Sequence, residues 1–189
     1  KKSIIMERFI MQDLIAWKNR EDRKPLILLG ARQVGKTYIL KEFGQREFEN
    51  VAYINCDNNA MVKDLFATDY NIERILLTIG AITGVNIQAG KTLIIMDEIQ
   101  ELHRGLASLK YFCEDAREYH VAVAGSLLGL TLHQGESYPV GKVNTLEMFP
   151  MTYEEFLLAR GFKQRVDLLQ SGMKTEDRKS GSAGMPRPI

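Results

Sequence analysis

The sequence predicts an α/β fold of three layers, with a mainly parallel five-stranded sheet between two layers of helices. Short, fully apolar runs recur along the chain, as expected for strands buried on both faces of a parallel sheet. The segments between these runs are long enough to hold crossover helices. A stretch with two glycines, GARQVGKT at residues 30–37, joins the first apolar run to a segment of helical spacing.

The composition is that of a globular chain without a strong charge. With 189 residues, 45% of them hydrophobic, the chain can bury one sizeable core. The 25 basic and 24 acidic residues nearly cancel, so no overall field attracts nucleic acid or anionic lipid. Cys56 and Cys113 lack metal-ligand spacing, and no run approaches the roughly 20 apolar residues of a membrane helix. We therefore expect a soluble, cytoplasmic protein with reduced thiols and no membrane partner.

The elements follow one another in an alternating order. Apolar residues at helical spacing over 4–17 predict an amphipathic helix, and the charged stretch 19–24 leads into the strand PLILLG at 25–30. Further strands are predicted at 51–56, 92–97 and 121–125, with a weaker one at 142–147. Helices are predicted at 36–43, 60–66, 71–82, 105–117 and 152–160.

The tail suggests a boundary. From Ser171 onward the residues are mainly Gly, Ser, Pro and charged, which is typical of a linker or of a truncated domain edge. We predict an N-terminal helix and linker at 1–24, a core at 25–150, and the truncated start of a helical lid or linker at 151–189.

Residues 30–37 match the pattern G-x-x-x-x-G-K-[ST] between a buried strand and a helix, where a phosphate-binding loop (P-loop, Walker A) requires it. The glycines allow backbone N–H groups to approach phosphate oxygens closely. Lys36 would reach the β- and γ-phosphates, and the Thr37 hydroxyl would bind Mg²⁺. The residues expected to contact the nucleotide are Gly30, Ala31, Arg32, Gln33, Val34, Gly35, Lys36, Thr37 and Tyr38.

A second motif supplies the acidic partner that a metal-bound nucleotide needs. The stretch TLIIMDEIQ places Asp97 at the end of an apolar strand and Glu98 directly after it, as in a Walker B segment. Asp97 would hold Mg²⁺ directly or through water, because ligands bind at the carboxyl ends of parallel strands. Glu98 would activate the attacking water. The predicted catalytic residues are Lys36, Asp97, Glu98 and Ser126, and the predicted metal ligands are Thr37 and Asp97.

The strand at 51–56 separates the two motifs in sequence, which favours the branch of P-loop ATPases with an extra strand between them. In that branch the strand ending at Gly125 inserts between the strands of the two motifs. Ser126 would then lie near the γ-phosphate. It is also a good helix N-cap, and the two roles can coexist.

The segments LGARQVGKT, LIIMDEIQE, SLKYFCEDA, AGSLLG and FPMTYEEFL together resemble the AAA+ superfamily. Within it they resemble prokaryotic ATP-binding proteins, relatives of archaeal-type ATPases, whose ATPase core precedes a separate C-terminal domain. The resemblance covers most of residues 1–170 and implies the roles given above. Relatives often carry an arginine after a glycine ahead of the last strand, where this chain has Gly141 and Lys142.

Several basic and histidine side chains have two interpretations. Arg32 could touch a phosphate or point to solvent, and Arg104 and Arg117 could act in a neighbouring subunit's site or be ordinary exposed arginines. The residues His103, His120 and His133 share no metal spacing, so we expect them at the surface or locally hydrogen-bonded.

These observations favour a Mg²⁺-dependent ATPase core that serves as a conformational switch or motor for an attached or partner module. The alternatives are a nucleotide-gated interaction protein with negligible turnover and a P-loop kinase, for which no arginine-rich lid is evident. A GTPase is disfavoured because the guanine-reading [NT]-K-x-D motif is missing. The partners expected are ATP and a second copy or another protein. Nucleic acid is a possible partner through a missing C-terminal domain, but this chain gives no indication of it.

Overall fold

A computed structural model of the chain describes residues 9–57, 59–125, 139–150 and 167. Within it Ile10–Pro150 form one compact unit. The predicted helix at 152–160, the first part of the predicted helix at 4–17, Ser126 and His133 lie outside the described residues. The boundaries proposed for the three segments of the chain remain predictions.

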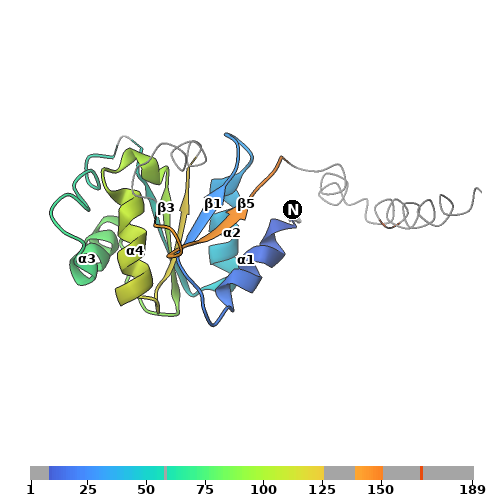
Figure 1. Cartoon of the computed structure of the whole chain (residues 1–189), viewed down its shortest axis with the longest axis horizontal. Helices are drawn as coiled ribbons and strands as arrows, with labels where there is room; N and C mark the ends of the chain where they lie inside the picture. Colours follow the sequence, from blue (N-terminus) through green and yellow to red (C-terminus); the bar gives the residue numbers. More distant parts are fainter. Residues whose placement is uncertain (1–8, 58, 126–138, 151–166, 168–189) are drawn as a thin grey trace, which may run out of the picture. The chain divides into compact units, whose positions relative to one another are not determined.

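The unit is built on a five-stranded sheet with the order β2-β3-β4-β1-β5, and every neighbouring pair is parallel (Figure 1). This confirms the predicted fold class and the insertion of β4 between the strands of the two motifs. The strands are β1 (Leu26–Leu29), β2 (Asn50–Asn55), β3 (Thr92–Asp97), β4 (His120–Ala124) and β5 (Asn144–Glu147).

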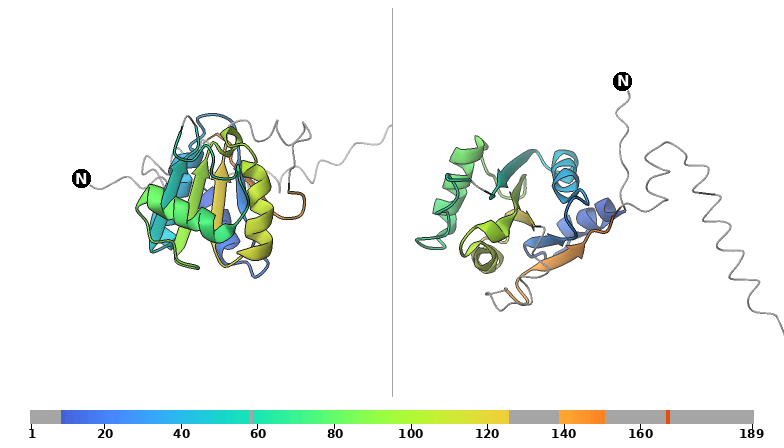
Figure 2. Two further views of the ribbon diagram at one scale, coloured as in Figure 1. Left: turned by 90° about the vertical axis from the view of Figure 1, so that its left-hand side faces the viewer. Right: turned by 90° about the horizontal axis from the view of Figure 1, so that it is seen from above.

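Helices cover both faces of the sheet. The helices are α1 (Ile10–Lys18), α2 (Lys36–Glu47), α3 (Ile72–Thr83) and α4 (Gly105–Asp115), with a short 3₁₀ helix, η1, at Ile99–Glu101. In the left view of Figure 2, α3 and α4 lie in front of the strands. α1 and α2 pack on the opposite face, so the unit has the three predicted layers.

Alternate residues of each strand enter different cores, because successive side chains of a strand point to opposite faces. In β3, Ile94 and Met96 pack in the cluster with α3 and α4, whereas Leu93 and Ile95 pack with α1 and α2. All the residues of β3 and β4 are buried. This explains why both strands read as unbroken apolar runs rather than as alternating patterns.

Local signals determine where the helices begin and end. The side chain of Asn71 caps α3 by accepting a hydrogen bond from the Arg74 N–H at 2.9 Å. Gly84, with φ 69°, ends the same helix in the left-handed conformation that glycine adopts without strain. No helix of the described residues is long and apolar enough to cross a membrane.

One predicted helix is wrong. Residues 60–66 form consecutive turns, with i to i+3 hydrogen bonds such as Leu65 N–H to Val62 O at 3.0 Å. The apolar residues that suggested a helix do enter the core, because Val62, Leu65 and Phe66 are buried. The spacing of these apolar residues therefore reflects the burial of one side of the segment, although the segment does not form a continuous helix. The other predicted elements within the described residues agree with the observed bounds to within a few residues.

Candidate nucleotide-binding site

The predicted phosphate loop runs from the end of β1 to the start of α2 and has the backbone of an anion-binding turn. Gly30 and Gly35 have φ values of 149° and 96°, and Gln33 has a φ of 64°. Only glycine adopts the first two readily. Gly35 precedes α2 without a side-chain cap, so the first N–H groups of the helix remain available to an anion.

The main chain directly after β5 packs against this loop. A Cβ atom on Gly30 would lie 2.4 Å from the Met148 carbonyl oxygen. The Met148 N–H donates to the Leu29 oxygen at 2.8 Å, which fixes that segment beside β1. Gly30 therefore needs to be glycine for its contact with Met148 as well as for its φ. Sequence reasoning missed Met148, since it belongs to neither motif.

The Lys36 side chain is turned inward. It is 7% exposed, and its Nζ donates to the carbonyl oxygens of Gly30 and Ala31 at 2.8 Å each. Burial lowers the pKa of Lys36, while the charges of Glu98 and Asp97 oppose that shift. The ammonium group thus lies inside the loop and within the field of both Walker B carboxylates.

The two predicted metal ligands are brought together. The Thr37 Oγ1 donates to the Asp97 Oδ2 at 2.5 Å, and the other oxygen, Oδ1, accepts from the Glu98 N–H at 3.1 Å. A hydroxyl and a carboxylate are the oxygen donors that Mg²⁺ prefers, and Mg²⁺ commonly takes its remaining ligands from water and phosphate. No cluster of three or more His, Cys, Asp or Glu that could hold a metal occurs among the described residues. The Thr37 hydroxyl and the Asp97 carboxylate fit Mg²⁺ that takes its other ligands from water and a phosphate.

Glu98 has an unusual backbone for its residue type. Its φ of 52° is left-handed, a conformation that costs a non-glycine residue roughly 1 kcal/mol or more. Its Oε2 accepts a hydrogen bond from the Gln100 Nε2 at 2.5 Å. Such strain tends to occur at functional sites. Gln100 lies two residues after Glu98. The sequence analysis did not predict it as a site residue.

Tyr53 on the neighbouring strand β2 and Cys56 directly after that strand approach Asp97 and were also missed. The Tyr53 phenol donates to the Asp97 Oδ2 at 3.3 Å, and the Cys56 N–H donates to the Asp97 main-chain oxygen at 2.9 Å. Burial, reinforced by the charge of Asp97, raises the pKa of Tyr53 to about 12 and that of the Cys56 thiol to about 12. No motif indicates them, because their positions depend on how β2 pairs with β3.

Other predicted contacts lie at the surface. Arg32 and Tyr38 are exposed, and a hydrogen bond from the Tyr38 phenol to Glu42 raises the pKa of Tyr38. Arg104 lies over the Tyr70 ring, 4.4 Å from its centroid, and donates to the Tyr70 oxygen. Lys142 pairs with Glu114 at 2.8 Å.

The side chain of Arg117, two residues after the end of α4, donates from its Nε to the Cys113 oxygen of that helix at 3.3 Å. These contacts account for Arg104 and Arg117 within the chain.

His120 departs from expectation. It is buried, and its Nδ1 has no hydrogen-bond partner among the described residues, so it is neither a surface histidine nor a fully hydrogen-bonded one. Its ring contacts Trp17 and Phe48 edge-on. Burial lowers the pKa of His120 to about 4, with the charge of Arg23 acting in the same direction. The residue is therefore neutral at physiological pH.

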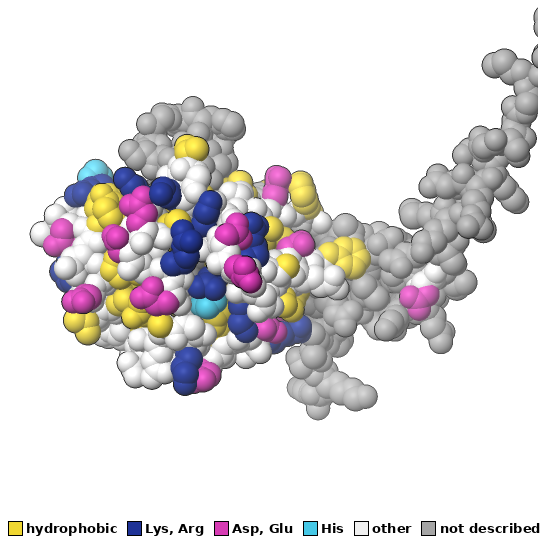
Figure 3. All heavy atoms as spheres, turned by 60° about the horizontal axis from the view of Figure 1, so that its bottom comes forward, with side chains coloured by type: hydrophobic (Ala, Val, Ile, Leu, Met, Phe, Trp, Pro, Cys, Tyr) yellow, Lys and Arg dark blue, Asp and Glu magenta, His cyan; other side chains and the backbone are white. Residues whose placement is uncertain are grey.

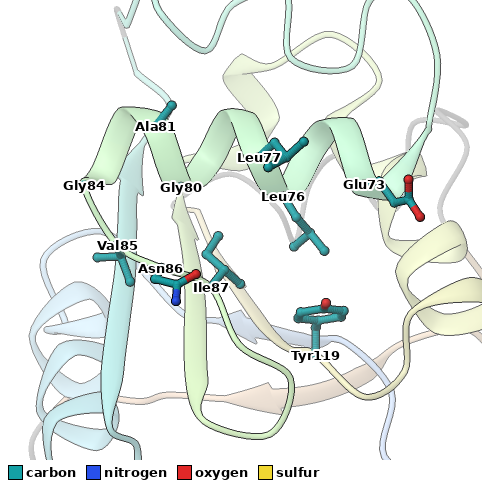
Figure 4. Close-up of a pocket in the computed structure, with 10 residues that line it drawn as sticks. All are labelled: Glu73, Leu76, Leu77, Gly80, Ala81, Gly84, Val85, Asn86, Ile87 and Tyr119. Atoms are coloured by element: carbon teal, nitrogen blue, oxygen red, sulfur yellow. The ribbon is translucent and has the colours of Figure 1, made fainter.

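A groove of about 630 Å³ lies away from the phosphate loop, between α3 and the segment that follows it (Figure 4). Leu76, Ile87 and Tyr119 surround it, and Glu73 is its charged lining residue. A largely apolar groove with a carboxylate does not suit a phosphate. On the face shown in Figure 3, basic and acidic side chains are interspersed rather than gathered into one patch.

Taken together, the glycine loop, the buried lysine and the Thr37–Asp97 contact at the carboxyl end of a parallel sheet define a P-loop nucleotide-binding protein. Comparison with protein families gives the narrower assignment. Residues 22–157 match the AAA domain family, and the chain belongs to that family. An AAA domain implies ATP binding and hydrolysis, and its members are generally ATPases. A search among curated proteins finds no match.

Solved structures show the same fold. The Walker-type ATPase PABY2304 of Pyrococcus abyssi superimposes with a TM-score of 0.56 at 20% identity, covering 85% of this chain and 59% of that one. The RuvB Holliday junction branch migration motor of Thermotoga maritima gives 0.50 at 16% identity, covering 82% and 50%. The chain thus spans about 59% and 50% of the lengths of these two proteins.

Proposed function

We propose that this chain is a Mg²⁺-dependent ATPase core whose cycle of binding and hydrolysis acts as a conformational switch or motor for an attached or partner module. The observation that carries the proposal is the contact of Thr37 Oγ1 with Asp97 Oδ2 at 2.5 Å. It joins the two motifs of a metal-nucleotide site across 60 residues of sequence.

In this proposal different residues of the site bind the phosphates and the metal. The N–H groups of the loop and of the first turn of α2 bind phosphate oxygens. Lys36 exchanges its bonds to the Gly30 and Ala31 carbonyls for bonds to the β- and γ-phosphates. Thr37 and Asp97 would hold Mg²⁺, which when bound would offset the charge that develops on the phosphates.

Glu98 acts on the attacking water. It follows Asp97 directly, and its side chain is half-buried beside the Gln100 amide. A carboxylate at this point can orient a water and accept its proton. Ser126, which lies outside the described residues, follows β4 and is proposed to help place the same water.

The module moved by the cycle is proposed to follow the core or to bind it. The Met148 main chain, directly after β5, bonds to Leu29 and packs against Gly30 of the phosphate loop. A shift of the loop would therefore displace the chain where it leaves β5. The likeness to a branch migration motor concerns the fold alone. It gives no reason to assign a nucleic-acid substrate here.

The substitution Glu98→Gln tests the chemical step. The amide keeps the size of the side chain and loses the charge, so ATP affinity should stay within about threefold. Single-turnover hydrolysis should fall by roughly 10²- to 10⁴-fold, the usual contribution of a general base. Glu101→Gln, an exposed change three residues along, is the control.

Hydrolysis by Glu98→Gln within threefold of the unmodified protein would refute the role of Glu98. Tight ATP binding with negligible turnover in the unmodified protein would instead favour a nucleotide-gated interaction protein. A specific activity that rises with protein concentration would indicate sites completed by a second copy.

A further inference from the structure

We propose that Tyr53 is a positioning residue for Asp97, and that it strengthens the coupling between Mg²⁺ and ATP binding. The inference rests on the proposed function, because it concerns the metal that Thr37 and Asp97 would hold. It adds a residue outside both sequence motifs.

The geometry places the Tyr53 phenol on the carboxylate oxygen that Thr37 also contacts. Asp97 Oδ2 accepts from the Thr37 hydroxyl at 2.5 Å and from the Tyr53 hydroxyl at 3.3 Å. Tyr53 lies on β2, the strand beside β3, and pairs with Ile95, two residues before Asp97. A half-buried tyrosine there brings its hydroxyl to the end of the neighbouring strand. The carboxylate is therefore held from two elements, α2 and β2.

The Tyr53 ring is itself held in place. Lys41 Nζ lies 3.4 Å from the ring centroid, within the range of a cation–π contact. Lys41 is four residues after Thr37, so both side chains lie on the same face of α2. One helix face thus contacts the carboxylate directly through Thr37 and indirectly through the tyrosine ring.

Removing the phenol should weaken Mg²⁺ coupling for a geometric reason. Mg²⁺ requires near-octahedral oxygen ligands, so a carboxylate free to rotate binds it less well, directly or through water. An opposing effect exists, since a lost hydrogen bond leaves more charge on Oδ2. Orientation should dominate, because among the described residues the hydrogen bonds left to the carboxylate group would be those from the Glu98 N–H and the Thr37 hydroxyl. We expect a loss of about three- to tenfold, the worth of one hydrogen bond.

The experiment measures the dissociation constant of ATP by calorimetry in excess Mg²⁺ and in EDTA. The coupling is expressed as the ratio of the dissociation constant in EDTA to that in Mg²⁺. Tyr53→Phe should leave the affinity in EDTA unchanged and reduce the ratio about three- to tenfold. Tyr111→Phe makes the same chemical change on α4, away from the loop, and should leave both values unchanged.

Lys41→Met provides a second variant. It keeps the aliphatic part of the side chain and removes the charge over the ring, so the ratio should fall in the same direction but by less. In the Tyr53→Phe background the same change should add nothing, because the hydroxyl that Lys41 helps to place is gone.

Three results would overturn the proposal. One is a ratio for Tyr53→Phe that is within twofold of the ratio of the unmodified protein, or higher than it. Another is an equal loss of ATP affinity in Mg²⁺ and in EDTA. The third is additive effects of the two variants. Failure of the proposed function looks different: the unmodified protein would then show no ATP binding, or binding that ignores Mg²⁺, and both proposals would fall together.

Discussion

Replacing Gly30 by alanine should damage both the fold and the phosphate loop. The new Cβ would meet the Met148 carbonyl oxygen at 2.4 Å, and the φ of 149° is one that side-chain-bearing residues rarely adopt. The Met148 segment resists displacement, since its N–H is bonded to the Leu29 oxygen at 2.8 Å. Either the loop or the end of β5 must therefore move.

The size of the effect follows from these two contributions. Backbone strain of this kind costs about 1–3 kcal/mol, and a rigid overpacked contact adds about 1–3 kcal/mol. Partial relaxation should leave a total near 2–4 kcal/mol in the free energy of unfolding. The loop that moves is the one that binds phosphate, so MgATP affinity should also fall by at least about tenfold, or 1.4 kcal/mol.

Urea unfolding followed by Trp17 fluorescence measures the first quantity, and calorimetry with MgATP measures the second. The matched control is Gly84→Ala, because Gly84 also has a positive φ, 69°, but an added Cβ would meet nothing within 4 Å. That variant should lose only about 1 kcal/mol and keep its ATP affinity. If Gly30→Ala costs no more than the control and binds MgATP normally, the argument from Met148 is wrong.

Two further predictions concern charged groups. Lys36→Ala should abolish measurable MgATP binding in calorimetry while leaving the circular dichroism spectrum unchanged, whereas the exposed control Lys91→Ala should bind normally. His120 has a folded pKa of about 4 against 6.5 when unfolded, so its neutral form favours folding above pH 6.5 and that contribution is lost as the pH falls toward 4. From this group, urea unfolding should give a free energy of unfolding about 2 kcal/mol lower at pH 5 than at pH 8. His120→Phe should remove that part of the pH dependence. An unchanged pH dependence in the variant would contradict the assignment.

The sequence was sufficient for the fold class and for the local backbone of the glycine loop. Unbroken apolar runs such as Leu93–Met96 indicate strands buried on both faces, and that burial is what a parallel sheet between helices provides. The spacing of Gly30, Gly35, Lys36 and Thr37 determines a local backbone shape, because glycine conformations and a helix start are set within a few residues. Features that depend on a few neighbouring residues can therefore be predicted from the sequence alone.

Only the tertiary structure decided which distant residues meet at the site. Tyr53 reaches Asp97 because β2 pairs with β3 in one register, and Met148 reaches Gly30 because β5 pairs with β1. Strand order and register depend on packing summed over the whole core, so no single segment encodes them. The burial of His120 has the same origin, because its ring contacts Trp17 and Phe48, which lie far away along the chain.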